Sequence, residues 1–161
     1  MPLSKIPSNM QTALTSAEMP DGNIVQYIPS TFATFQTRYQ TTSNSYGASI
    51  YSLTITPKSA TNLILMSYHL SAYNNSSSHY CYAMVQRVGT GGLIQTENAT
   101  GLGAWCTLSA SASEVAGTTN AITYTIYCRV NGGTGYFGWS GGGWSSPSQN
   151  FNSFHLMEIA A

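Results

Sequence analysis

Charged side chains are scarce in this sequence: of its 161 residues, only 6% are Asp, Glu, Lys or Arg. A typical globular domain has about 25%. The five basic residues stand singly along the chain, at Lys5, Arg38, Lys58, Arg87 and Arg129. Binding nucleic acid through its phosphates requires a clustered basic surface. The sequence therefore argues against a nucleic-acid partner.

Long apolar runs and cysteine pairs are missing as well. Runs such as residues 63–66 fall far short of the roughly 20 residues that span a bilayer, and no signal-peptide pattern is present. We therefore expect no membrane insertion. The three cysteines are odd in number and form no CxxC pair, which favours small core residues in a protein made in a reducing cytoplasm.

Aromatic residues and short β-prone runs are what the sequence does have. Eleven Tyr, five Phe and three Trp predict an ordered chain in spite of its polarity. From Gly22 onward, apolar and polar residues alternate in runs separated by Gly, Asn, Ser and Pro, as expected for strands and turns. The predicted strands cover residues 24–28, 32–40, 50–56, 63–73, 79–88, 93–96, 104–110, 122–130 and 151–159.

Some eight to ten short strands predict an all-β fold, an antiparallel β-sandwich or jelly roll. We assign this module to residues 21–161. Residues 1–20 contain Pro2, Pro7 and Pro20 and few groups able to join a core, so we expect a short extended segment that acts as an anchor or linker.

Several predicted strands are apolar on both faces. Tyr82 and Met84 alternate with Ala83 and Val85, whereas a two-layer sandwich needs only one apolar face on each strand. A partner subunit is the simplest cover for the second face, so we expect a homo-oligomer. The alternative is that exposed Tyr and Met side chains simply form part of the surface.

Two enzyme-like motifs fail on their context. Residues 133–138 match GxGxxG, but a dinucleotide site needs a helix behind the glycines, and residues 139–147 are too rich in glycine and proline to form one. Residues 138–142 match GxSxG, yet no acid lies between Ser140 and His155 to complete a triad. We therefore expect no enzyme and no cofactor.

Metal and carboxylate chemistry is equally weakly supported. His79 and Cys81 are two apart on a predicted strand, but zinc needs at least three protein ligands, so we predict no metal site. The five acidic residues are isolated from one another in the sequence. Two carboxylates can still meet in space, which leaves a glycan-active enzyme as a distant alternative.

Aromatic residues alternate with glycine in residues 136–144. Tyr and Trp offer large contact areas at low entropic cost and are typical of recognition surfaces. We expect Tyr136, Phe137, Trp139 and Trp144 to contact a receptor or glycan, or alternatively to pack between subunits.

Four stretches resemble one family. They are MPDGNIVQ (19–26), TTSNSY (41–46), LTITPKSATNLIL (53–65) and FHLMEIAA (154–161). On these residues the chain is similar to the β-rich C-terminal modules of tail-fibre and other virion surface proteins in phages of cyanobacteria and marine bacteria. The resemblance covers nearly everything after residue 18, and it implies a trimeric jelly-roll-like module without cofactor or catalysis.

The resemblance leads us to expect an adhesive protein of the virion surface, of the fibre-tip or receptor-binding type, with other virion proteins and a host-surface glycan or receptor as partners. The apolar side chains Leu3, Ile6, Met10 and Leu14 are the expected virion anchor. The alternative is a capsid-decorating protein bound to the shell through residues 1–20, because so short a segment cannot form a fibre shaft.

Overall fold

The computed structural model describes residues 21–30, 39–98, 105–138 and 152–161, and no residue in these ranges is helical. Accordingly, this part of the chain has no helix long and apolar enough to cross a membrane. The described residues form ten strands: β1 (Ile24–Pro29), β2 (Tyr39–Thr41), β3 (Ala48–Ile55), β4 (Leu63–Asn74), β5 (Cys81–Arg87), β6 (Gly91–Asn98), β7 (Trp105–Val115), β8 (Ile122–Val130), β9 (Gly135–Phe137) and β10 (Ser153–Ile159).

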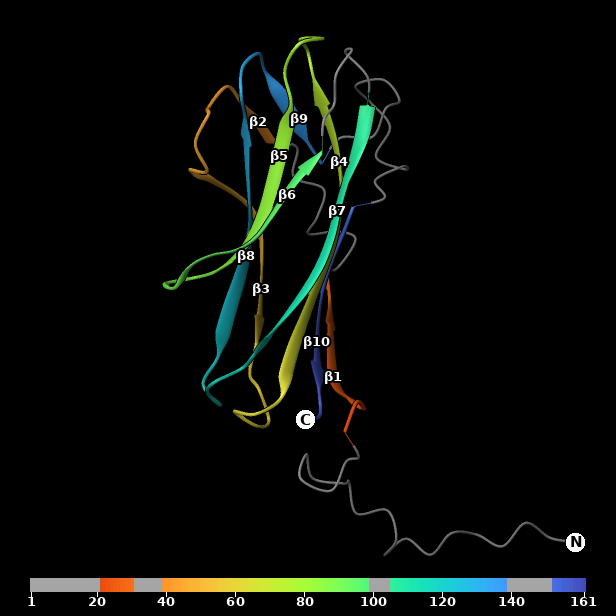
Figure 1. Cartoon of the computed structure of the whole chain (residues 1–161), viewed down its shortest axis with the longest axis vertical. Helices are drawn as coiled ribbons and strands as arrows, with labels where there is room; N and C mark the ends of the chain where they lie inside the picture. Colours follow the sequence, from red (N-terminus) through yellow and green to blue (C-terminus); the bar gives the residue numbers. More distant parts are fainter. Residues whose placement is uncertain (1–20, 31–38, 99–104, 139–151) are drawn as a thin grey trace, which may run out of the picture.

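The strands form two antiparallel sheets that face each other (Figure 1). Sheet A has the order β1-β10-β4, with β7 on the other edge of β4 and the short strands β9 and β2 alongside its second half. Sheet B has the order β3-β8-β5-β6. The all-β sandwich expected from the sequence is thus confirmed.

The strand pairing identifies the sandwich as a jelly roll. β5 pairs with β6, β4 with β7, β3 with β8 and β1 with β10. Each of these pairs encloses the previous one in the sequence, as in a long hairpin that has been rolled into two sheets. Eight-stranded sandwiches of this kind occur in viral capsid and lectin domains.

The core lies between the sheets and follows the alternation of each strand. In β4, the inward residues Ile64, Met66 and Leu70 are buried, while their neighbours face outward and remain partly exposed. Sheet B meets them with the inward residues of β5 and β8, including the cysteines Cys81 and Cys128. Burial raises the pKa of the Cys128 thiol well above its usual value, so this residue behaves as a small apolar core group.

Several strand boundaries differ from the predictions. β8 spans the predicted residues 122–130, whereas β7 continues to Val115, beyond the predicted end at residue 110. The second half of β7 is rich in serine and is held by its ladder to β4, which pairs eleven residues from Val115 to Trp105. Of the predicted strand 32–40, only Tyr39 and Gln40 lie among the described residues, both in β2.

The two ends of the sandwich differ, and we call them the base and the top. The base, at the bottom of Figure 1, holds the start of β1 and the end of β10, joined by a hydrogen bond from Gly22 N to Ala160 O (2.8 Å). It also holds the connections of residues 56–62 and 116–121. The top holds the loops of residues 75–80 and 131–134.

Candidate functional site

A buried carboxylate organises the base of the sandwich. Glu158, on β10, has no exposed surface. Its Oε1 accepts hydrogen bonds from Lys58 N (2.7 Å), Ser59 N (3.2 Å) and Asn62 Nδ2 (2.7 Å), and its Oε2 accepts one from Gln26 Nε2 (2.6 Å). Four donors replace the water that a buried carboxylate loses. Glu158 therefore fastens the β3–β4 connection to the last strand.

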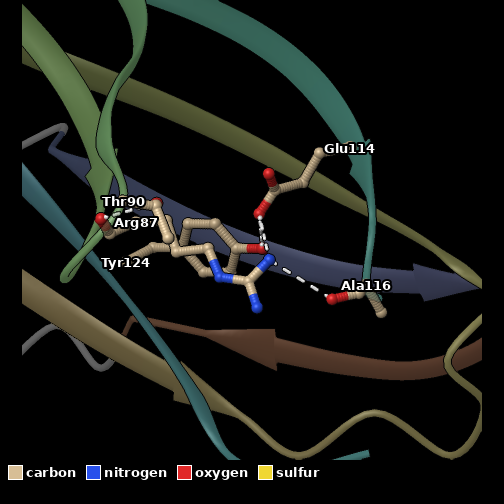
Figure 2. A network of polar contacts seen from close by, with 5 residues as sticks. All are labelled: Arg87, Thr90, Glu114, Ala116 and Tyr124. Carbon is tan, nitrogen blue, oxygen red and sulfur yellow. Dashed lines mark hydrogen bonds and ion pairs between the residues drawn. The ribbon is translucent and has the colours of Figure 1, made fainter. Parts of the chain in front are cut away.

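A second carboxylate joins the two sheets (Figure 2). Glu114, on β7 of sheet A, accepts a hydrogen bond from the Tyr124 hydroxyl (2.5 Å) and forms an ion pair with Arg87 (3.4 Å), both from sheet B. The same nitrogen of Arg87 also donates to Ala116 O (3.2 Å). Burial and the hydrogen bond to Glu114 raise the pKa of Tyr124, so its hydroxyl remains a donor.

The two carboxylates belong to one row of sheet A. Glu158 and Glu114 are the cross-strand neighbours of Ile64 on either side, so all three residues point into the sandwich. Sequence reasoning treated these acids as isolated. In the structure they lie on either side of Ile64 in one row, and each accepts hydrogen bonds from protein groups. Chemically, the arrangement holds the sheets and loops together.

A hollow of about 340 Å³ lies beside this network, between the β5–β6 turn and the start of β8. Its lining includes Arg87, Thr90, Ile122 and Thr123. The volume is near the lower limit of small-molecule pockets, roughly 300 Å³. The hollow is open to solvent, and Arg87, one of its lining residues, is already paired with Glu114.

The histidine and cysteine considered as metal ligands are not on one strand. β5 begins at Cys81, which points into the core, whereas His79 lies in the preceding loop, where Ser76 Oγ is 2.7 Å from its Nδ1. The expectation that both residues share a strand face was wrong, because the loop continues two residues further than predicted. Within the described ranges no three His, Cys, Asp or Glu residues are grouped as metal ligands.

The predicted contact residues fall in different environments. Phe137 is fully buried in the core, so its assignment to a receptor or subunit contact is corrected: β9 alternates, and Phe137 is on its inward side. Tyr136 is half-buried on the outward side, and its ring lies 5.8 Å from that of Tyr73. Trp139 and Trp144 lie outside the described residues, as do Leu3, Ile6, Met10 and Leu14.

Sequence reasoning missed a cluster of side chains near the top of sheet B. The Arg129 guanidinium carbon lies 3.7 Å from the centre of the Tyr82 ring and 5.1 Å from that of Tyr46, and the ring of Tyr80 meets Tyr82 edge to face. Such cation–π contacts hold side chains in place on a surface. The register that sets Tyr82 opposite Arg129 has no signal in the sequence, because the two strands are distant along the chain.

The loops at the top are joined by hydrogen bonds. Asn75 N donates to Thr134 O (3.0 Å), Thr134 N donates to Asn75 Oδ1 (2.8 Å), and Tyr80 N donates to Asn131 Oδ1 (2.6 Å). Gly132 permits this close approach, because a Cβ there would lie 2.2 Å from the His79 ring. The top is therefore a pre-organised surface.

No family model matches the sequence, and no curated protein matches it significantly. Solved structures that resemble it include those of infectious bursal disease virus strains Gx and Gt, with TM-scores of 0.42 and 0.41 and 11% identity in both cases. A third is the crystal structure of the VP2 subviral particle of infectious bursal disease virus, with a TM-score of 0.41 and 13% identity.

These matches cover 84 to 88% of this chain but only 36 to 38% of the matched chains. The chain thus spans little more than a third of the length of these viral proteins.

Proposed function

We propose that this chain is a non-enzymatic structural protein of a phage virion surface, of the fibre-tip or receptor-binding type, which attaches through its base and presents its top to the host. The observation that carries the proposal is the difference between the two ends. Asp21 and Gly22, which directly follow residues 1–20 in the sequence, lie at the base, whereas the top is formed by loops joined through hydrogen bonds, with aromatic residues around them.

The chemistry of the top suits recognition. Tyr82 and Arg129 of sheet B group with Tyr46 and Tyr80 of the adjoining loops, and Tyr73 and Tyr136 pair on sheet A. Tyrosine combines an apolar ring with a hydroxyl, and recognition surfaces favour it together with Ser, Gly and Asn. The loops at the top supply those smaller residues. A host-surface glycan or receptor is the ligand class that such a surface fits.

Attachment is assigned to residues 1–20, with the apolar residues Leu3, Ile6, Met10 and Leu14 as its contacts. A segment that becomes ordered on binding can cover a large surface at modest affinity. A chain that begins at Asp21 should therefore fold but fail to join particles that lack the wild-type protein. Normal incorporation of this shortened chain would refute the anchor.

Immunogold labelling of intact particles tests the location. Antibodies raised against the purified chain should label the tips of the tail fibres. Label distributed over the head would overturn the fibre-tip assignment in favour of a capsid-decorating protein. If the antibodies label the protein only after the particles have been disrupted, a surface location is wrong altogether.

Competition for host cells tests recognition. The purified chain should block adsorption of the phage, and Tyr80→Ser should weaken that block. Val88→Ser provides the matched control, because Val88 is also exposed but lies on the β5–β6 turn, away from the top. Equal blocking by all three proteins, or no blocking by the wild type, would contradict a receptor-binding role for the top.

A further inference from the structure

The outer face of sheet A is a regular array of side chains. Strand register aligns residues from β1, β10, β4 and β7 into rows that run across the sheet. Starting from the base, the rows are Ile24, Ile159, Leu63 and Val115; then Tyr27, Met157, Leu65 and Ser113; then Pro29, His155, Ser67 and Ser111; and finally Ser153, His69 and Ser109. We call these four rows the A face.

The A face is apolar toward the base and carries no Asp, Glu, Lys or Arg in any row. Ile24, Tyr27 and Val115 are 57%, 50% and 54% exposed, and the aliphatic residues between them are half-buried. They are three of the five large apolar side chains that are exposed among the described residues. A contiguous apolar patch of this kind on a soluble domain marks an interaction site.

The absence of charge indicates what can cover the A face. A strongly charged partner would lose hydration of its charged groups there and find no opposite charge in return. A second A face, or another uncharged surface of the same chain, has no charged groups and therefore loses no hydration of charge on contact. A chain with only 6% charged residues provides such a surface in a second copy.

The size of the A face also fits a subunit contact. Strands about 4.8 Å apart and rows about 6.8 Å apart give three rows of four residues and one row of three a flat area of somewhat less than roughly 19 by 27 Å. Protruding side chains make the accessible area larger than this flat area, which brings it toward the roughly 800 Å² that each partner contributes to a stable interface.

We infer that a second copy of this chain covers the A face, and that the apolar rows at the base form the centre of the contact. The inference rests on the homo-oligomer that the sequence leads us to expect, and it names the interface of that oligomer. It can fail or hold independently of host recognition, because oligomer mass and cell adsorption are separate measurements.

Sedimentation of the purified full-length chain at micromolar concentration provides the test. The wild type should sediment as an oligomer of the 17.2 kDa chain. For the trimer that the resemblance implies, the mass would be three times that of the chain. The mass should not change from about 0.1 M to about 1 M salt, because a neutral interface does not depend on charge attraction. A monomeric wild type, or dissociation by salt, would overturn the inference.

Val115→Lys locates the interface. A lysine there would be buried without a partner in the oligomer but solvated in the monomer, so the dissociation constant should rise by at least about tenfold. Val88→Lys is the matched control, since Val88 is 55% exposed and lies outside the A face. Both variants should keep the wild-type β-sheet circular dichroism. Equal masses for Val115→Lys and wild type, or equal dissociation of the two variants, would refute the A face as the contact.

A shortened chain beginning at Asp21 distinguishes the remaining occupant. Residues 1–20 of the same chain also carry apolar side chains and precede Ile24 by only a few residues in the sequence. If the shortened chain keeps the wild-type oligomeric state, a second copy is the occupant. If it is monomeric, the N-terminal segment makes the contact and our inference is wrong.

Discussion

The backbone N–H of Lys58 donates a hydrogen bond to the Glu158 carboxylate (2.7 Å), although 100 positions separate the two residues. Lys58 belongs to the stretch LTITPKSATNLIL and Glu158 to FHLMEIAA. Gln26, which also donates to Glu158, ends the stretch MPDGNIVQ, so three of the four stretches that carry the family resemblance are in direct contact. The β3–β4 connection and Gln26 supply the donors, and the last strand supplies the acceptor. These three stretches thus form a single structural unit at the base.

Removal of the Glu158 carboxylate should destabilise the fold strongly. Glu158→Ala leaves buried donors from the β3–β4 connection and from Gln26 without an acceptor, and we expect a loss of about 3 to 5 kcal/mol. Denaturant unfolding followed by circular dichroism measures it. Asp21→Ala, at an exposed acidic residue, should change the free energy of unfolding by less than about 0.5 kcal/mol. Similar values for both variants would contradict the role of Glu158.

Tyr124→Phe should lower stability by about 1.5 to 3 kcal/mol, the usual contribution of a hydrogen bond to a charged group. The ring would stay in the core, while Glu114 would keep only its ion pair with Arg87. Tyr127→Phe is the control, because the Tyr127 side chain faces outward on the same strand. Comparison of the two denaturation midpoints checks this prediction, and coincident midpoints would refute it.

Phe137→Ala should lower the free energy of unfolding. Truncation of a fully buried Phe typically costs about 3 to 5 kcal/mol, and Phe137 has no exposed surface. Tyr136→Ala, at the half-buried outward neighbour, should cost clearly less. Thermal unfolding of the two variants measures the difference. An unchanged melting temperature for Phe137→Ala would return this residue to the set of surface contacts.

His155 should make the protein less stable on mild acidification. Its ring stacks on Tyr27, whose hydroxyl lies 2.7 Å from Nδ1, and its cross-strand neighbours are Pro29 and Ser67, none of them charged. Burial lowers the pKa of His155 below its usual 6.5, so the unfolded chain binds a proton more readily than the folded one. The contribution of His155 to the free energy of unfolding is therefore complete above the usual pKa of 6.5 and is lost as the pH falls below it.

Melting temperatures between about pH 5.5 and about pH 7.5 bracket the usual histidine pKa and check this prediction. His155→Asn should show a shallower decline toward acid than the wild type. An equally steep decline in the variant would assign the pH dependence to another group.

The elements that the sequence predicted best are those in which one face is apolar and the other polar. In the sequence of β8, core residues alternate with Thr, Tyr and Arg, and the predicted and observed bounds of the strand agree. The second half of β7 was missed because its outward residues are Ser and its inward residues are Ala and Glu, which gives no hydrophobic period. Pairing with β4 holds it in the sheet, and a single strand does not reveal its partner.

The candidate sites were harder to predict for the same reason. Glu114, Glu158 and Ile64 share a row only through two strand registers, and each strand comes from a different part of the chain. The assignment of Phe137 to a surface failed because its neighbours are glycines and aromatics, which suit a loop as well as a strand. In the structure, Gly135 packs closely against Val130 and Phe137, which leaves no room for a Cβ and explains why this position is glycine.

The nested strand pairing also bears on the order in which the protein can assemble during synthesis. The β5–β6 hairpin has the shortest connection and the lowest cost of loop closure, and the outer pairs need partners that are made progressively later. β10 lies between β1 and β4, so β1 has no neighbour in sheet A until residues 153–159 have left the ribosome. Sheet A can therefore be completed only after nearly the whole jelly roll has been translated.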